Sequence, residues 1–147
     1  MKTIILKTAI LLALGLFLLA SQNKNALAQS VAVIAHKSSP AQNLEADKIL
    51  DIYTLNTKSW SDGSKITVFE LKGDSPVKSR FYAALNTAFT EMQKLWLKKQ
   101  FSGKGLPPTA VNSEQELLEK VANTPGAIAY VNAENVGKNV KVLATIK

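Results

Sequence analysis

Ile66-Thr-Val-Phe69 is followed after two residues by Lys72-Gly-Asp-Ser-Pro-Val77, and this second part gives the clearest local signal in the chain. The first part is a short apolar and β-branched run, which is typical of a strand. In the second part, Ser75 can accept a hydrogen bond from the opening turn of a helix, and Pro76 has the φ angle that the first helical position needs. The stretch therefore predicts a strand that passes through a loop directly into a helix, which should run to about Leu85.

The same alternation of strand and helix continues on both sides of this stretch. Asn43 is a suitable N-cap for a helix, and Ser113-Glu-Gln-Glu116 has the pattern of a capping box. The further elements that we predict are strands at 31–35, 128–131 and 140–143, and helices at 43–53, from 87 to about 102, and from 113 to about 121. Strands that alternate with helices predict one α/β domain with a mixed, mostly parallel sheet flanked by helices.

The N-terminus has the features of a secretory signal peptide. Lys2 and Lys7 supply positive charge, an apolar run covers residues 9–20, and Ala26-Leu-Ala28 has small residues where a signal peptidase requires them. An uncleaved membrane anchor is the alternative, but 12 apolar residues are fewer than the roughly 20 that a spanning helix needs. We predict a signal peptide at 1–28, cleavage after Ala28, a domain at 29–147, and a periplasmic location.

Composition excludes several classes of chemistry. The chain has no cysteine, which excludes disulfides, thiolate metal sites, a cysteine nucleophile and a lipid-modified N-terminal cysteine. Three lysines lie within residues 1–28, so the formal charge falls from +7 to +4 after cleavage. Because export removes the protein from the genome, we expect no nucleic-acid partner.

Four lysines could attract an anionic partner, although a solvated helix face is the simpler interpretation. They are Lys94, Lys98, Lys99 and Lys104.

Residues suited to catalysis are scarce. His36 is the only histidine, and no Gly-x-Ser-x-Gly motif accompanies it, so a hydrolase centred on it is disfavoured. One histidine without cysteine also disfavours a zinc or copper site. The two tryptophans have structural interpretations, with Trp96 on the core side of a helix and Trp60 holding the turn at Asp62-Gly63. We therefore predict a non-enzymatic protein without a metal or cofactor.

The predicted helix start at Ser75 is the best candidate for binding chemistry. The first N–H groups of a helix have no partner inside it, and together with the helix dipole they favour an oxyanion. Gly73 would let a ligand come close to the backbone. The alternative is an ordinary helix cap, in which Asp74 could occupy the same N–H groups. The candidate oxyanion-binding residues are Lys72, Gly73, Asp74, Ser75, Val77, Lys78 and Arg80.

Several motifs, in this order along the chain, resemble segments of the phosphate ABC transporter substrate-binding proteins. Together they cover about residues 31–132, and the last of them is the most specific. The loop at 70–76 is Glu-Leu-Lys-Gly-Asp-Ser-Pro, where the family typically has Arg-Ser-Asp-Gly-Ser-Gly-Thr. The matching segments are Ile49-Leu-Asp-Ile-Tyr-Thr-Leu55, Lys58-Ser-Trp-Ser-Asp-Gly63, Lys72-Gly-Asp-Ser-Pro76, Trp96 with Phe101-Ser-Gly-Lys-Gly105, and Thr124-Pro-Gly-Ala-Ile-Ala-Tyr-Val131.

The resemblance implies a type II periplasmic-binding-protein fold, of which this chain has room for a single lobe. It implies binding of phosphate or a related oxyanion for ABC-type uptake or sensing, with Ser75 at the position of a phosphate-contacting serine and an ABC permease as a partner. The family arginine is missing from this loop, and Pro76 stands at a family glycine. The alternative function is an envelope interaction module that binds a protein partner or a second copy of itself, without a small ligand.

Overall fold

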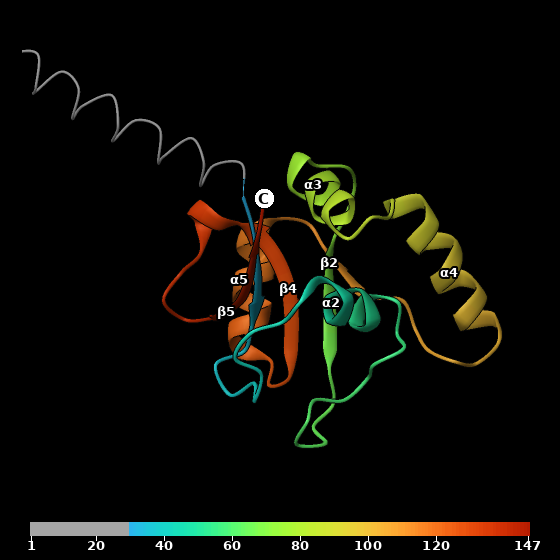
Figure 1. Cartoon of the computed structure of the whole chain (residues 1–147), viewed down its shortest axis with the longest axis horizontal. Coiled ribbons are helices and arrows are strands. Elements are labelled where there is room, and N and C mark those ends of the chain that lie inside the picture. The colour runs from blue at the N-terminus through green and yellow to red at the C-terminus, as the bar shows by residue number, and fades with distance from the viewer. Residues whose placement is uncertain (1–29) are drawn as a thin grey trace, which may run out of the picture.

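Residues 30–147 are described by a computed structural model, so the predicted signal peptide at 1–28 lies outside the described residues. Figure 1 shows how the strands and helices of this part of the chain follow one another. The strands are β1 (Val31–Ala35), β2 (Thr67–Leu71), β3 (Thr109–Val111), β4 (Ala127–Asn132) and β5 (Lys141–Ile146). The helices are α2 (Ala46–Tyr53), α3 (Pro76–Ala84), α4 (Phe89–Phe101) and α5 (Glu114–Asn123), with a 3-10 turn η1 (Ala133–Asn135).

The strands of residues 30–147 form one sheet in the order β3-β2-β4-β1-β5. β2 pairs in parallel with β3 and β4, whereas β1 pairs antiparallel with β4 and β5. β2, β3, β4 and β5 therefore run in the same direction, and β1 runs in the opposite direction between β4 and β5. This arrangement confirms the predicted α/β fold with a mixed sheet flanked by helices. The sheet is less parallel than predicted, because two of its four strand pairings are antiparallel.

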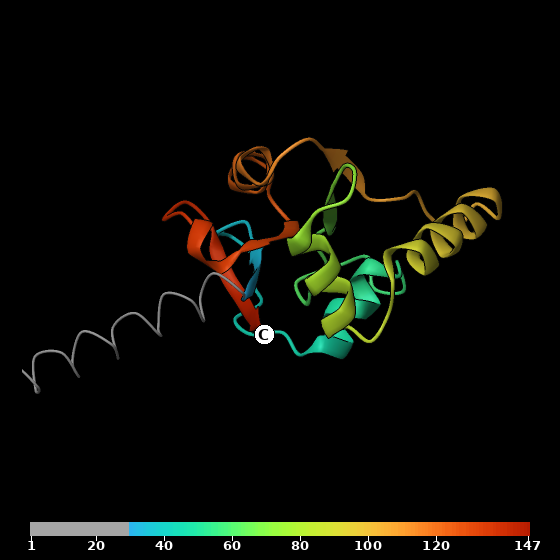
Figure 2. The same ribbon diagram turned by 90° about the horizontal axis from the view of Figure 1, so that it is seen from above.

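Helices cover both faces of this sheet. Figure 2 shows α5 on one side and α2 and α3 on the other, while α4 stands at an outer end of the molecule. All five residues of β1 and the first five of β4 are buried. Continuous apolar runs of this kind are typical of strands that are enclosed on both faces. On the α3 side, the ring of Phe81 stacks on that of Tyr130, with 4.1 Å between the ring centroids.

Two of the predicted helix starts are confirmed in detail. Ser75 caps α3 by accepting a hydrogen bond from the backbone N–H of Lys78, and Ser113 caps α5 by accepting one from that of Glu116. In each case the hydroxyl satisfies a donor that the helix itself leaves without a partner. The stretch at 66–77 thus has the predicted structure of a strand followed by a loop and a helix.

The predicted start of α2 is wrong by two residues. Glu45 rather than Asn43 holds the N-cap position, and its side chain makes no capping hydrogen bond. The cause is tertiary, because the backbone N–H of Leu44 donates to the carbonyl of Leu143 next to it in space. This bond keeps the chain extended past Asn43, so the helix begins later than the local sequence indicates.

β3 was not predicted as a strand. Its three residues follow Pro107-Pro108 and pair with β2 in parallel. Within β3 only Val111 is buried, while Thr109 and Ala110 are exposed. Three residues with one buried side chain give no alternation for a sequence pattern to detect, so the pairing with β2 decides this strand.

Both tryptophans have the structural roles that the sequence predicted. The Trp60 indole N–H donates to the carbonyl of Gly126 at 3.1 Å, and the Trp60 backbone closes the turn through the carbonyl of Ser64 at 2.8 Å. The Trp96 indole N–H donates to the carbonyl of Tyr53 at 2.7 Å. These bonds join α2 to α4 and the turn to the start of β4.

In residues 30–147 the helices are all too short or too polar to cross a membrane.

Candidate functional site

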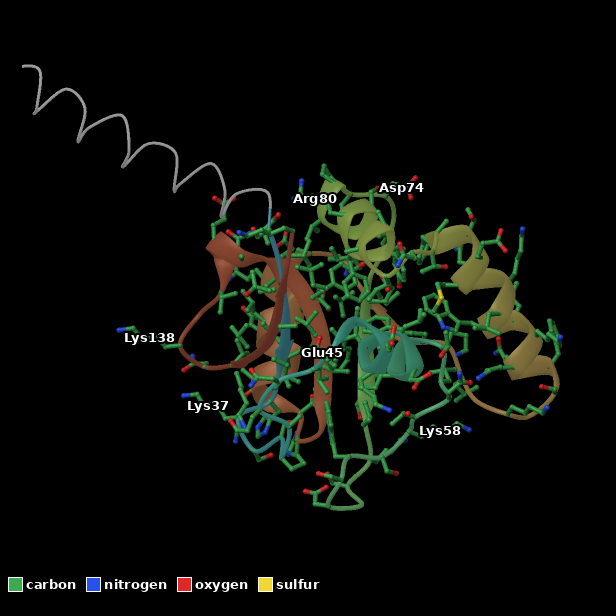
Figure 3. All side chains as sticks on the ribbon, viewed as in Figure 1. Lys37, Glu45, Lys58, Asp74, Arg80 and Lys138 are labelled. Carbon is green, nitrogen blue, oxygen red and sulfur yellow. The ribbon has the colours of Figure 1, made fainter. Side chains whose placement is uncertain are left out.

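The candidate oxyanion loop lies at the edge of the sheet where three parallel strands end. β2 ends at Leu71, β3 at Val111 and β4 at Asn132, and α3 and α5 begin directly after the first two. Binding sites of open α/β sheets lie at such an edge, because the loops that follow the strands gather there. Figure 3 shows Asp74 and Arg80 projecting from the α3 end of the molecule at this edge.

The backbone of this loop has N–H groups available for a ligand. Within residues 30–147, the N–H groups of Gly73, Asp74, Ser75 and Val77 donate no hydrogen bond to the protein. The Lys78 N–H is already taken by the Ser75 hydroxyl at 3.3 Å. Gly73 has a φ of 72°, and a Cβ built on it would meet nothing within 4 Å. The loop surface is therefore open, and its free donors face no competing protein acceptor.

The structure separates the predicted oxyanion residues into exposed and buried ones. Lys72, Gly73 and Asp74 are exposed, and Ser75 is half-buried. Arg80 is half-buried one turn further along α3, and the side chains of Val77 and Lys78 are buried. Of the two lysines, Lys72 alone has its charge at the loop surface, since only 1% of Lys78 is exposed.

Lys78 belongs instead to a buried cluster around Glu70. Its ammonium group donates to the carbonyl of Leu71, lies 3.6 Å from a carboxylate oxygen of Glu70, and sits 3.7 Å from the ring centroid of Phe89. The hydroxyl groups of Tyr82 and Tyr130 donate to the two oxygens of the same carboxylate. The Glu70 carboxylate is therefore held inside the protein by several donors, and it points away from the loop surface.

Burial dominates the protonation behaviour of this cluster. The pKa of Glu70 is raised, because the cost of burying its charge exceeds the stabilisation from Tyr130, Tyr82 and Lys78. The pKa values of the Tyr82 and Tyr130 hydroxyls are also raised, first by burial and then by the nearby Glu70 charge. Both tyrosines consequently remain protonated and serve as donors.

Arg80 is engaged in a second network at the same edge. Its guanidinium donates to the side-chain carbonyl of Asn132 at 2.6 Å, and the Asn132 amide donates to Glu114 at 2.6 Å. The backbone N–H of Asn132 donates to the other oxygen of Glu114, also at 2.6 Å. Sequence reasoning missed Asn132 and Glu114. The signal that could have identified them is their position, at the end of a strand and the start of a helix on one sheet edge.

Two other features lie away from this edge. A groove of about 370 Å³ borders the opposite, amino end of β2, and its lining includes Leu55, Lys58, Ile66 and Leu106. At the end of β1, Nδ1 of His36 lies 2.7 Å from the Ser38 hydroxyl and also accepts the Ser38 backbone N–H at 3.1 Å. These contacts form a local turn between residues two positions apart. Across residues 30–147, no group of three or more metal-ligating side chains is gathered.

Solved structures share this arrangement of elements. A protein assigned as a phosphate ABC transporter substrate-binding protein, from Clostridium perfringens and with bound phosphate, matches with a TM-score of 0.65 and 19% identity over 78% of this chain and 44% of that chain. An ABC-type phosphate transport receptor from Vibrio cholerae matches with a TM-score of 0.63 and 19% identity, covering 80% of this chain and 46% of that one. This chain has the fold of one lobe of such a substrate-binding protein. PstS from Borrelia burgdorferi matches likewise, with a TM-score of 0.57 and 17% identity over 78% of this chain and 46% of that chain.

The one-lobe fold confirms the resemblance that the sequence motifs indicated. This chain spans less than half the length of each of these three structures. The Clostridium and Vibrio proteins are transport binding proteins by description, not enzymes. No family model and no curated protein matches the sequence itself. The likeness therefore rests on the fold, and the function has to be argued from the residues of this chain.

Proposed function

We propose that this chain is a periplasmic substrate-binding-protein-like domain that binds phosphate or a related oxyanion at residues 72–78. The observation that carries the proposal is the set of free backbone N–H groups on Gly73, Asp74, Ser75 and Val77, at the edge where the parallel strands end. Free backbone N–H groups in a loop that leads into a helix start favour an anion. The exposed ammonium group of Lys72 adds positive charge.

The environment of Glu70 removes one objection to this site. The loop lacks the family arginine, and a Glu70 carboxylate directed at the loop would repel an anion. In this structure 3% of Glu70 is exposed, and its carboxylate accepts hydrogen bonds from two tyrosines inside the protein. Asp74 is the remaining acidic residue of the loop, and it is exposed. We therefore expect Asp74 to weaken anion binding.

Isothermal titration with phosphate and with sulfate tests the site. The Ser75→Ala variant should lose affinity, because the hydroxyl orients the loop. Ser113→Ala is the matched control, since Ser113 makes the same capping bond at α5 and each change costs about 1 kcal/mol of stability. Asp74→Asn should bind more tightly than the natural chain. The proposal is wrong if neither the natural chain nor Asp74→Asn gives heat or thermal stabilisation at millimolar phosphate.

Transport or sensing through an ABC permease is the role that we propose for this binding. A second lobe would be needed to cover the ligand, because the loop is open and residues 30–147 have the fold of one lobe. We propose that another chain supplies it. The same observation favours a second candidate function, an interaction module whose exposed edge binds an envelope protein or a second copy of this chain. Sedimentation with and without phosphate separates the two. Association that ignores phosphate supports the module, and phosphate-dependent association supports the covered ligand site.

A further inference from the structure

The outer end of α4 carries a mixed apolar and basic surface. Leu97 is 51% exposed and Phe101 is 87% exposed. Lys94 and Lys98 are also exposed, and they lie three or four positions from these two residues, so the four side chains share one face of the helix. We call these four residues the α4 face. Figures 1 and 2 both show α4 as a projection at one end of the molecule.

Further lysines lie close to the α4 face. The ammonium group of Lys58 donates to the carbonyl of Lys104, just beyond the helix, and that of Lys99 donates to Asn56 at 2.7 Å. The pKa of Lys99 is lowered by partial desolvation and by the charges of Lys58 and Lys104. Figure 3 shows Lys58 projecting on the side of the molecule where α4 lies. Lys94 is paired with Glu91 at 2.8 Å. Lys58, Lys98, Lys99 and Lys104 leave this end of the molecule with a net positive charge.

We propose that the α4 face docks onto the surface of an anionic lipid bilayer, with Phe101 and Leu97 entering the interface and the lysines contacting the headgroups. Apolar side chains flanked by lysines are the pattern of interfacial membrane contacts. Each lysine near an anionic surface strengthens the attachment. A second copy of the chain is a poor occupant, because two such faces would repel each other. The core of a protein interface is also depleted of lysine, whereas lysines alternate with the apolar residues here.

The absence of cysteine makes a direct test available. In the full chain, Phe101→Cys is labelled with an environment-sensitive apolar fluorophore, and Lys138→Cys carries the same label as a matched control. Lys138 is exposed and lies at the opposite end of the molecule from α4 (Figure 3). Residues 1–29 are common to both variants, so a difference between the labels reports the docking of this face alone. The probes are vesicles of phosphatidylcholine, with or without phosphatidylglycerol.

We expect the label at position 101 to shift to the blue on vesicles that contain phosphatidylglycerol, and the label at position 138 to remain unchanged. Salt should weaken the response. Adding Lys94→Gln and Lys98→Gln should raise the lipid concentration at half response about 30-fold. Equal responses at both positions, or a response that is independent of phosphatidylglycerol, would overturn the proposal. So would a shift produced by soluble polyglutamate but not by vesicles, which would assign the face to an acidic protein partner.

Discussion

The hydroxyl of Tyr130 donates a hydrogen bond to the carboxylate of Glu70, a residue 60 positions earlier in the chain. The bond connects β4 to β2 in the interior, directly beneath the loop at 72–75. Tyr82 donates to the second oxygen of the carboxylate from α3, and the backbone N–H of Leu71 donates to the first oxygen at 3.0 Å. The base of the open loop is thereby fixed by three elements of the fold.

Removing the Tyr130 hydroxyl should show how much its hydrogen bond to Glu70 contributes to the stability of the protein. Tyr130→Phe leaves the buried carboxylate with one donor fewer, so we expect a loss of about 1–3 kcal/mol in the free energy of unfolding in urea. Tyr53→Phe is the matched control, because the Tyr53 hydroxyl is also buried but makes a 3.4 Å bond to the neutral carbonyl of Phe69. An equal loss in both variants would contradict a special role for the carboxylate.

The raised pKa of Glu70 predicts a pH dependence of stability. An ordinary glutamate titrates near 4.5, and the native state holds the Glu70 proton to higher pH than that. Between pH 4.5 and the raised pKa of Glu70, the native state binds more protons than the unfolded chain. The contribution of Glu70 to stability is therefore present at low pH and is lost as the pH rises. Relative to Glu70→Gln, the natural chain should lose stability from below pH 4.5 towards neutrality. The opposite slope would show that Lys78 and the tyrosines outweigh burial.

Two glycines with the same backbone conformation should tolerate alanine differently. Gly126 has a φ of 79°, and a Cβ there would lie 2.2 Å from the carbonyl oxygen of Lys65. Gly63 has a φ of 83°, and a Cβ there would meet nothing within 4 Å. We expect Gly63→Ala to cost about 1–2 kcal/mol from the backbone conformation alone. Gly126→Ala should cost about 3–5 kcal/mol in thermal or urea unfolding, because a backbone group must also move. Equal costs would contradict this packing.

The predicted signal peptide has its own test. Expression of the full chain in a bacterium with two membranes should yield a periplasmic product that begins at Gln29, as measured by intact mass. Ala28→Arg, which removes the small residue before the predicted cleavage site, should leave the precursor uncleaved. A natural chain recovered with its residues 1–28 intact would contradict the prediction.

Much of this fold could be predicted from the sequence where a local pattern and the tertiary structure agree. The buried runs at 31–35 and 128–131 and the caps at Ser75 and Ser113 were predicted correctly, because each depends on residues close together in the sequence. The start of α2 could not be predicted in this way. It is delayed by the backbone hydrogen bond from Leu44 to Leu143, which joins residues far apart in the sequence. The same reason applies to β3, whose existence depends on β2.

The loop and the helix start of the candidate site could be predicted from the sequence, but the directions of its long charged side chains could not. Lys78 carries the same charge as Lys72 and lies one turn away from the helix start. The sequence has no signal that it is drawn inward by Glu70 and the Phe89 ring. The direction of the Arg80 side chain could not be predicted either, because its hydrogen-bond partner Asn132 lies at the end of a strand far along the chain. Helix geometry gives the direction of a backbone N–H group, whereas the direction of a long charged side chain depends on partners elsewhere.

β1 has neighbours on both sides that come from far along the chain. Val33 pairs with Tyr130 in β4 and with Ala144 in β5. While the chain is being synthesised these partners do not yet exist, and pairing across such separations is slow once they do. The first strand to be made is thus among the last to be completed. Until β5 has been synthesised, β1 lacks one of its two partner strands, so the sheet of residues 30–147 is incomplete and the polypeptide is easier to hold unfolded.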